Sequence, residues 1–121
     1  MRILVVDDDE LNVELFEATL RNDGHDVAIE RSGPAGELRA LGEAFDLILL
    51  DIQLPGRTGI EVCRTLRESG VAAPIMALSA SVLPAEIAKT KNAGFTRFLA
   101  KPLAPAELRA AVRAVDTPNA A

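Results

Sequence analysis

Acidic, hydroxyl and amino side chains follow short apolar runs at four widely separated places in this sequence. In chain order they are Asp7, Asp8, Asp9, Asp51, Ser79 and Lys101. Carboxylates that gather at one point repel one another, and they stay ionised together only when a cation joins them. Oxygen ligands without histidine or cysteine favour Mg²⁺ or Mn²⁺. If the fold brings these residues together, they form a site for a hard divalent metal.

The same set of residues suits phosphoryl transfer. An aspartate carboxylate is a known nucleophile that forms an aspartyl phosphate, and the reaction needs mainly positioning and charge neutralisation. The metal and Lys101 would neutralise two sides of the phosphoryl group, and the Ser79 hydroxyl would donate to a third oxygen. Taken singly, each residue also has an ordinary structural explanation, because such aspartates and serines cap helices and turns and Lys101-Pro102 can simply start a helix.

Five apolar runs are the predicted strands that position these residues: 2–6, 26–29, 46–50, 74–78 and 97–100. The runs ILVV, LILL and IMAL lack polar alternation, which is typical of strands covered on both faces. The segments between the strands have helical spacing. The predicted faces comprise Leu11, Leu15, Ala18 and Thr19 in the first helix, with Phe16 and Leu20 beside them, Ile60, Cys63, Leu66 and Arg67 in the third, and Leu108, Val112 and Val115 in the last.

Repeated strand–helix units predict an α/β fold, a doubly wound five-stranded parallel sheet with helices on both faces. Sites in such sheets form outside the carboxyl ends of the strands, where all the residues above are expected. A chain of 121 residues fits one domain, since that size buries roughly two-thirds of the unfolded surface. We expect this domain over residues 1–116 and a short C-terminal tail over 117–121.

The composition excludes several classes of function. The net charge is −5 and the basic residues are scattered, which argues against direct binding of nucleic acid. No apolar run approaches the roughly 20 residues of a membrane-spanning helix, and the start MRILVVDDDE does not read as a signal peptide. The single cysteine, Cys63, is predicted to be a core thiol in a reducing cytoplasm. The single histidine, His25, is predicted to be a surface turn residue and not a phosphodonor.

The segments ILVVDDDELN, LILLDIQLPGRTGIEV, PIMALSA and FLAKPL resemble the receiver domains of two-component response regulators. The resemblance covers nearly the whole chain and looks closest to stand-alone receivers of the DivK type. It implies the flavodoxin-like (βα)5 fold of the CheY-like superfamily, with strand order 2-1-3-4-5.

The resemblance also implies a role for each acidic residue. Asp51 is the implied phosphoacceptor. Asp8 is the implied direct metal ligand, while Asp7 acts largely through water, and Asp51 and the backbone carbonyl of Gln53 complete the protein ligands. Asp9 then supplies charge at the start of the first helix and is not a ligand.

Ser79 is the implied switching hydroxyl, Lys101 the partner of the phosphoryl group, and Phe98 the switch aromatic. The Lys101–Pro102 bond is expected to be cis, a state largely confined to X-Pro bonds. Two departures from the family stand out. Phe98 has no hydroxyl, so its position cannot depend on a hydrogen bond from the ring. The loop 56–59 lacks the acidic residue that many relatives place before its second glycine, which we expect to alter the loop and not the chemistry.

The implied function is a two-state switch. A sensor histidine kinase or histidine phosphotransfer protein supplies the phosphoryl group, and the face made by the fourth helix, fifth strand and fifth helix changes shape for a downstream output protein. The kinase would dock on the first helix through Leu11, Asn12 and Leu15, unless the two leucines belong to the core. The chain takes part in its own phosphorylation and dephosphorylation without being a multiple-turnover enzyme. It is expected to be a monomer or a phosphorylation-dependent dimer, with no membrane partner.

Other functions stay open from the sequence. Within the family, the chain could be a phosphorelay intermediate or a phosphate sink, and a pseudo-receiver that only binds proteins is argued against by the complete residue set. A metal-dependent phosphatase would need a second carboxylate beside its nucleophile, but Ile52 and Gln53 follow Asp51. A flavin- or nucleotide-binding domain of the same topology would need a glycine-rich first loop in place of DDDEL.

Overall fold

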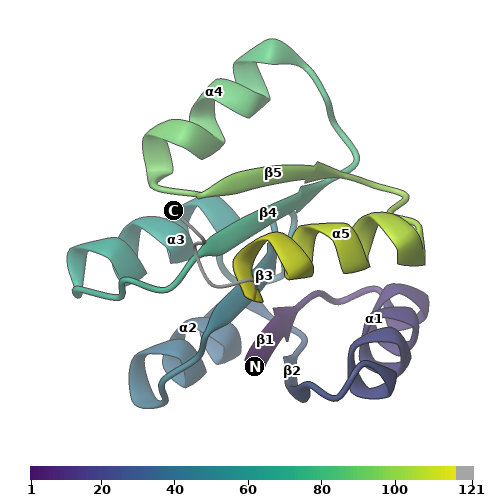
Figure 1. The fold of residues 1–121 in the computed structure, drawn as a ribbon. Coiled ribbons are helices and arrows are strands. Elements are labelled where there is room, and N and C mark those ends of the chain that lie inside the picture. Colours follow the sequence, from purple (N-terminus) through teal and green to yellow (C-terminus); the bar gives the residue numbers. More distant parts are fainter. Residues whose placement is uncertain (117–121) are drawn as a thin grey trace, which may run out of the picture.

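A computed structural model of the protein describes residues 1–116, and the expected tail 117–121 lies outside the described residues. Within residues 1–116, five strands alternate with five helices, as predicted (Figure 1). The elements are β1 (Arg2–Val6), α1 (Glu10–Asn22), β2 (Asp26–Glu30), α2 (Gly33–Gly42), β3 (Leu47–Asp51), α3 (Gly59–Glu68), β4 (Ile75–Ser79), α4 (Pro84–Ala93), β5 (Arg97–Ala100) and α5 (Pro105–Asp116). All strand pairs are parallel, and the strand order 2-1-3-4-5 confirms the prediction.

The sheet separates two apolar cores. Alternate residues of each central strand point to opposite faces, so Ile3 and Val5 join the core under α1 and α5 while Leu4 and Val6 join the core under α2, α3 and α4. Both faces of a doubly covered sheet must be apolar, which explains why β1, β3 and β4 show no polar alternation. No helix among the described residues has the length and apolar character needed to cross a membrane.

The strands end one residue later than predicted at the positions that matter for function. Asp51 is the last residue of β3 and pairs with Leu78, and Ser79 is the last residue of β4 and pairs with Ala100. The ladder continues because the Ile52 amide donates to the Leu78 carbonyl at 3.0 Å. Asp51 and Ser79 are therefore held by sheet hydrogen bonds and do not lie in the following loops.

The predicted apolar face of α1 is correct at Thr19 but wrong at Leu11, Leu15 and Ala18, and the side chains expected beside it, Phe16 and Leu20, are buried instead. The helix buries Val13, Phe16, Thr19 and Leu20 against the sheet, whereas Leu11 is 77% exposed and Leu15 is 37% exposed. The sequence offers two apolar stripes on this helix, and the one that packs inward carries the large Phe16 ring. The faces predicted for α3 and α5 are confirmed, since Cys63, Leu66, Leu108 and Val112 are all buried.

Cys63 is the core thiol that the sequence predicts. It has no exposed surface, and its Sγ atom lies 3.4 Å from the carbonyl oxygen of Ala93. Burial raises the pKa of the thiol to about 11, with the charge of Arg67 acting weakly in the other direction. A thiol of that kind is unreactive at neutral pH because the thiolate is the nucleophile.

Candidate functional site

The predicted residues meet at the carboxyl ends of the strands. A hollow of about 240 Å³ there is lined by Asp8, Asp9, Asp51, Gln53, Ala80 and Lys101. One carboxylate oxygen from each of Asp7, Asp8 and Asp51 lies within 4.8 Å of the others. The parallel sheet produces this arrangement, since β1 and β3 are neighbours and their carboxyl ends point the same way.

Lys101 reaches this cluster from the end of β5. Its Nζ atom donates to Oδ2 of Asp51 at 2.8 Å and lies 3.1 Å from Oδ2 of Asp7. The side chains of Asp7 and Asp51 are almost entirely buried, and that of Lys101 is 16% exposed. The Lys101–Pro102 peptide bond is cis, as predicted.

The charges of the cluster do not balance. Two buried carboxylates and the exposed Asp8 face one ammonium group. Oδ1 of Asp7 accepts a hydrogen bond from the Asp9 amide at 2.9 Å, but Oδ2 of Asp7 has no hydrogen-bond donor, because Lys101 approaches it outside hydrogen-bond geometry. A buried carboxylate oxygen without a donor is costly, and a bound divalent cation would remove that cost. The donor set, all oxygen, fits Mg²⁺.

The protonation of Asp51 and Lys101 depends on this environment. Burial raises the pKa of Asp51 from 3.8 to about 6; the hydrogen bond from Lys101 opposes this rise and the charge of Asp7 adds to it. Burial acts to lower the pKa of Lys101, but the hydrogen bond and charge of Asp51, together with the nearby charge of Asp7, outweigh it and raise the pKa above its usual value. Lys101 therefore stays charged at neutral pH, and most Asp51 carboxyls are ionised there.

The remaining predicted residues surround this centre. Asp9 caps α1, because its side chain accepts from the amides of Leu11 and Asn12 at 3.0 and 3.3 Å, which agrees with its predicted place at the start of the first helix. The Gln53 amide donates to Oδ1 of Asp51 at 3.1 Å, and Gln53 lines the hollow. The roles of the individual ligands, including the Gln53 carbonyl, stay predictions.

The two predicted switch residues lie on β4 and β5. Ser79 is buried, and its Oγ atom accepts from the Ser81 amide at 3.1 Å. Phe98 is partly buried and packs against the core under α2, α3 and α4. Phe98 pairs with Ala77 of β4. Ser79 and Phe98 therefore lie on adjacent strands.

The loop between β3 and α3 carries contacts that the sequence analysis missed. Thr58 caps α3 in a reciprocal capping box with Glu61, and the spacing Thr-x-x-Glu is the signal that identifies such a box. Arg57 bonds to Glu37 of α2 and Thr65 of α3. No local pattern predicts these two partners, because each belongs to another element.

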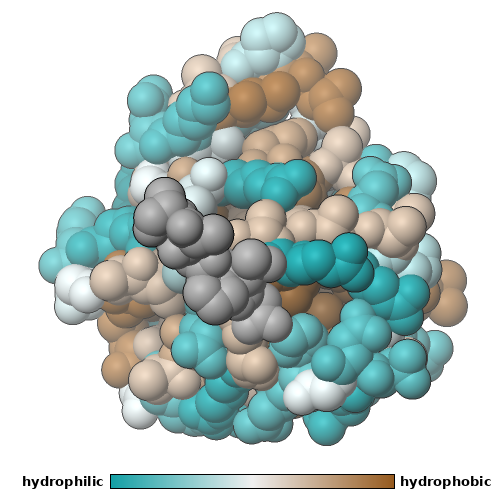
Figure 2. All heavy atoms as spheres, in the orientation of Figure 1, coloured by the Kyte–Doolittle hydropathy of each residue, from teal (hydrophilic) through white to brown (hydrophobic). Residues whose placement is uncertain are grey.

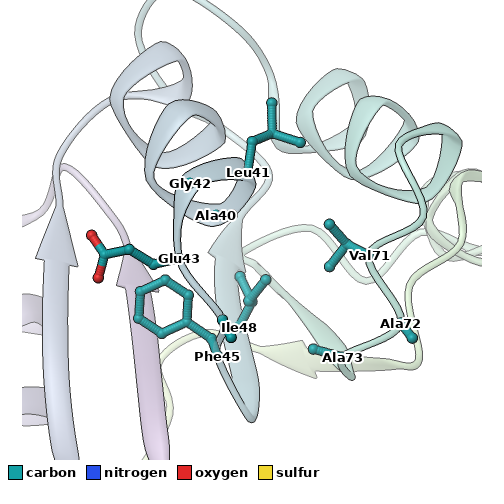
Figure 3. A pocket seen from close by; sticks show the side chains of 10 residues that line it. Ala40, Leu41, Gly42, Glu43, Phe45, Ile48, Val71, Ala72 and Ala73 are labelled. Carbon is teal, nitrogen blue, oxygen red and sulfur yellow. The ribbon is translucent and has the colours of Figure 1, made fainter.

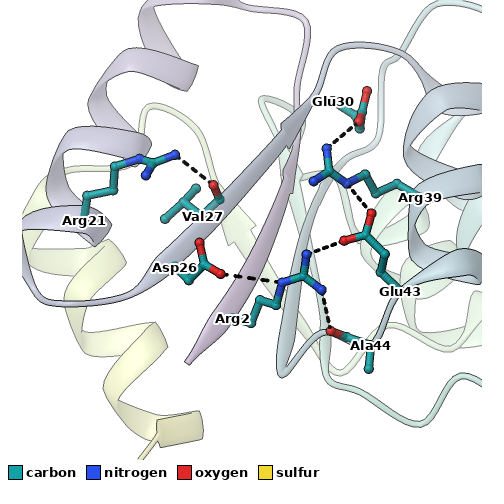
Figure 4. Close-up of polar contacts among 8 residues, drawn as sticks. All are labelled: Arg2, Arg21, Asp26, Val27, Glu30, Arg39, Glu43 and Ala44. Carbon is teal, nitrogen blue, oxygen red and sulfur yellow. Dashed lines mark hydrogen bonds and ion pairs between the residues drawn. The ribbon is translucent and has the colours of Figure 1, made fainter.

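A second ionic cluster runs from the amino-end edge of the sheet, at Arg2 and Asp26, along β2 to Glu30, and it differs in character (Figure 4). Arg39 contacts Glu30 and Glu43 at 3.0 and 2.8 Å, and Arg2 contacts Glu43 and lies 3.6 Å from Asp26. Two arginines here face three carboxylates, and all of these side chains are partly or largely exposed. Exposed pairs of this kind contribute modestly to stability and leave no buried charge for a metal.

A hollow near that edge is lined mainly by apolar side chains (Figure 3). Phe45, Ile48 and Val71 face it from the ends of α2 and α3 and the start of β3. Glu43 is its charged member, and that side chain is already bound to Arg2 and Arg39. The hollow therefore offers no group for acid–base or metal chemistry.

Comparison with known proteins agrees with the site and the fold. The chain is 44% identical over 115 residues to the DNA-binding response regulator MtrA of Mycolicibacterium paratuberculosis, covering 93% of this chain and 50% of MtrA. The chain thus spans about half the length of such curated relatives.

Two solved structures share the fold closely. The chemotaxis response regulator CheY4 of Vibrio cholerae has a TM-score of 0.88 at 28% identity, covering 94% of this chain and 97% of that one. The receiver domain of a sensor histidine kinase from Pseudomonas aeruginosa has a TM-score of 0.88 at 31% identity, covering 96% and 98%, and it has a magnesium ion coordinated in its active-site cleft. Residues 3–113 match the response regulator receiver domain. The chain belongs to the response regulator receiver domain family of two-component signalling.

Proposed function

We propose that this chain is a phosphorylation-dependent switch in which Asp51 accepts a phosphoryl group from the phosphohistidine of a sensor histidine kinase or histidine phosphotransfer protein. One observation carries the proposal: Asp51 lies within 4.8 Å of Asp7 and Asp8, and 2.8 Å from the ammonium group of Lys101. A buried nucleophile next to a cation and a cluster of metal-binding oxygens is the arrangement that phosphoryl transfer to aspartate requires.

The carboxylates of Asp7, Asp8 and Asp51 and the backbone carbonyl of Gln53 are the groups that we propose hold Mg²⁺. Asp8 is exposed and free to ligate directly, whereas the buried Oδ2 atom of Asp7 would contact the ion through a bound water. When bound, the metal neutralises charge on the carboxylates and on the phosphoryl oxygens.

In the transfer step, a carboxylate oxygen of Asp51 attacks phosphorus. The new O–P bond forms as the P–N bond of the phosphohistidine breaks, and the imidazole leaves with the electron pair and takes up a proton. Asp51 must be ionised for this attack, and its pKa of about 6 leaves it so at neutral pH. Lys101, already 2.8 Å from Asp51, is placed to donate to a phosphoryl oxygen.

The added charge then acts on Ser79 and Phe98. The Ser79 oxygen accepts from the Ser81 amide, which leaves its hydroxyl proton free to turn toward the phosphoryl group. Phe98 then moves into the space that Ser79 leaves. This movement changes the shape of the α4–β5–α5 face, which binds a downstream output protein. Helix α4 is suited to move, because it buries only Thr90 and Ala93 and its start lacks a side-chain cap.

Exposed apolar groups support the proposed partner surfaces. Leu11 and Leu15 are exposed on α1, next to the acidic cluster, and we propose that the kinase docks there. Figure 2 shows hydrophobic surface over the start of α4, where Val82 and Leu83 are exposed. We place the protein in the cytoplasm and expect a monomer, or a dimer formed on phosphorylation through the α4–β5–α5 face.

Phosphotransfer from a protein donor tests this function. A histidine phosphotransfer protein carrying radiolabelled phosphohistidine is mixed with the chain in Mg²⁺ buffer, and the products are separated and digested. We expect the label to move to the peptide that contains Asp51, and to stay on the donor when EDTA removes the metal. Label that stays on every such donor tried, with Mg²⁺ present, would contradict the proposal.

A further inference from the structure

The loop of residues 52–58, between β3 and α3, lies beside the site, and a backbone hydrogen bond joins its two ends. The Gly59 amide donates to the Ile52 carbonyl at 2.8 Å, and the Gln53 amide donates to the Asp51 carboxylate at 3.1 Å. Gly59 also lies directly against the end of β3, since a Cβ atom there would be 2.2 Å from the Asp51 carbonyl oxygen. The loop begins at the phosphoacceptor and carries Gln53 into the hollow.

The outer half of this loop rests on the start of α2. The Gly33 amide donates to the Pro55 carbonyl at 3.1 Å. A Cβ atom on Gly33 would lie 2.2 Å from the Arg57 carbonyl oxygen, so the two backbones touch without room for a side chain. The loop can therefore shift only if it separates from α2.

The side chain of Arg57 connects the loop to both neighbouring helices. Its Nε atom donates to Glu37 of α2 at 3.0 Å, and one terminal nitrogen donates to Thr65 of α3 at 2.8 Å. The side chains of Arg57 and Glu37 are 34% and 20% exposed, so the pair is largely covered. An ion pair that is largely covered, and whose arginine is also hydrogen-bonded to Thr65, holds its geometry better than a solvated ion pair.

We propose that Arg57, through Glu37, is a positioning residue for the metal site. It fixes the outer half of the loop and thereby the backbone of Gln53, whose carbonyl is a proposed ligand. This inference rests on the proposed function. Without the arginine the loop gains freedom that must be lost again when the ion binds, so metal affinity falls. Removal of groups that orient ligands directly costs about 10–100-fold in metal affinity, and we expect about three- to tenfold here because three loop residues separate Arg57 from Gln53.

Amide chemical-shift titrations with Mg²⁺ test this role in the full chain. Arg57→Ala and Glu37→Gln should each weaken Mg²⁺ binding by about three- to tenfold. The double variant should bind Mg²⁺ no more weakly than Arg57→Ala alone, because all three variants lose the same contact between Arg57 and Glu37. Arg57→Lys, which keeps the charge, should recover part of the affinity.

Arg67→Ala is the matched control. Arg67 lies on α3 and, like Arg57, bonds to neighbouring segments, here the carbonyls of Gly94, Val71 and Ala73 at 2.8–2.9 Å, but at the opposite edge of the sheet. It should lower stability to urea while keeping the Mg²⁺ affinity of the wild type. The inference is wrong if Arg57→Ala loses no more Mg²⁺ affinity than Arg67→Ala. If the wild type itself takes up no Mg²⁺, the proposed function fails as well, so the two failures are distinguishable.

Discussion

The ammonium group of Lys101 lies 2.8 Å from the carboxylate of Asp51, although 50 residues separate them along the chain. The same nitrogen lies 3.1 Å from the fully buried carboxylate of Asp7. One lysine thus holds two carboxylates that the sheet brings together. It balances only part of their charge, and the imbalance fits the divalent metal and the phosphoryl group that we propose for this site.

Removing the Lys101 charge should slow phosphoryl uptake. In Lys101→Gln the charge that develops on the phosphoryl oxygens loses one of its two proposed cationic partners, and we expect the initial rate to fall at least about tenfold. Intact mass against time with acetyl phosphate measures this rate. Lys89→Gln is the control, since Lys89 is 61% exposed and contacts only Glu86 among the ion pairs described within residues 1–116. Equal rates for the two variants would show that Lys101 has no part in the reaction.

The raised pKa of Asp51 makes the metal-free protein less stable as pH rises. Asp51 keeps its proton to about pH 6 in the fold but ionises near pH 3.8 when unfolded. Its stabilising contribution is present below pH 3.8 and is lost as pH rises through about 6. Asp51→Asn removes this titration, so its stability relative to wild type should rise by about 1–3 kcal/mol between pH 4 and pH 7.

Urea unfolding of both proteins in EDTA, at several pH values, measures that difference. Asp46→Asn offers a control on an exposed aspartate. A stability difference between Asp51→Asn and wild type that stays constant from pH 4 to pH 7 would show that the pKa of Asp51 is not raised in the fold.

Neighbouring aspartates should respond differently to metal. Mg²⁺ at about ten times its Kd should stabilise the wild type by about 1.4 kcal/mol, and Asp8→Asn should lose most of this gain because it removes a proposed ligand. Asp9→Ala removes the cap of α1 and should cost about 1 kcal/mol, yet keep the gain from Mg²⁺. Thermal melts with and without Mg²⁺ provide the comparison. A full Mg²⁺ gain in Asp8→Asn would exclude Asp8 as a ligand.

The exposed leucine on α1 should matter to a partner and not to folding. Leu11 is 77% exposed, so Leu11→Ala should change stability by less than about 0.5 kcal/mol. It should nevertheless slow phosphotransfer from a histidine phosphotransfer protein that phosphorylates the wild type, and leave labelling by acetyl phosphate unchanged. Leu38→Ala on α2, where Leu38 is 74% exposed, is the matched control. Equal transfer rates for both variants would argue against docking on α1.

The fold and the centre of the site could be predicted because both follow from simple rules. Parallel strands place their carboxyl ends together, so Asp7, Asp51, Ser79 and Lys101 had to share one edge once the strand–helix pattern was recognised. The burial of Asp7, Asp51 and Ser79 follows too, because strands with apolar residues on both faces lie at the centre of the sheet.

Other features depend on packing that no local pattern determines. Helix α1 carries two apolar stripes, and the choice between Leu11 and Phe16 as the buried one is made by the sheet beneath. The contacts of Arg57 with Glu37 and Thr65 join residues of different helices. The lack of a hydrogen-bond donor to Oδ2 of Asp7, which Lys101 contacts only as an ion pair, also appears only in three dimensions.

The most direct test of the central claim is the intact mass of the protein after incubation with acetyl phosphate, with and without Mg²⁺, beside Asp51→Asn. We predict one added phosphoryl group that requires Mg²⁺ and is absent from the variant. If no adduct forms with acetyl phosphate or with any phosphohistidine donor, Asp51 is not a phosphoacceptor. The chain would then be a pseudo-receiver that acts only by binding other proteins.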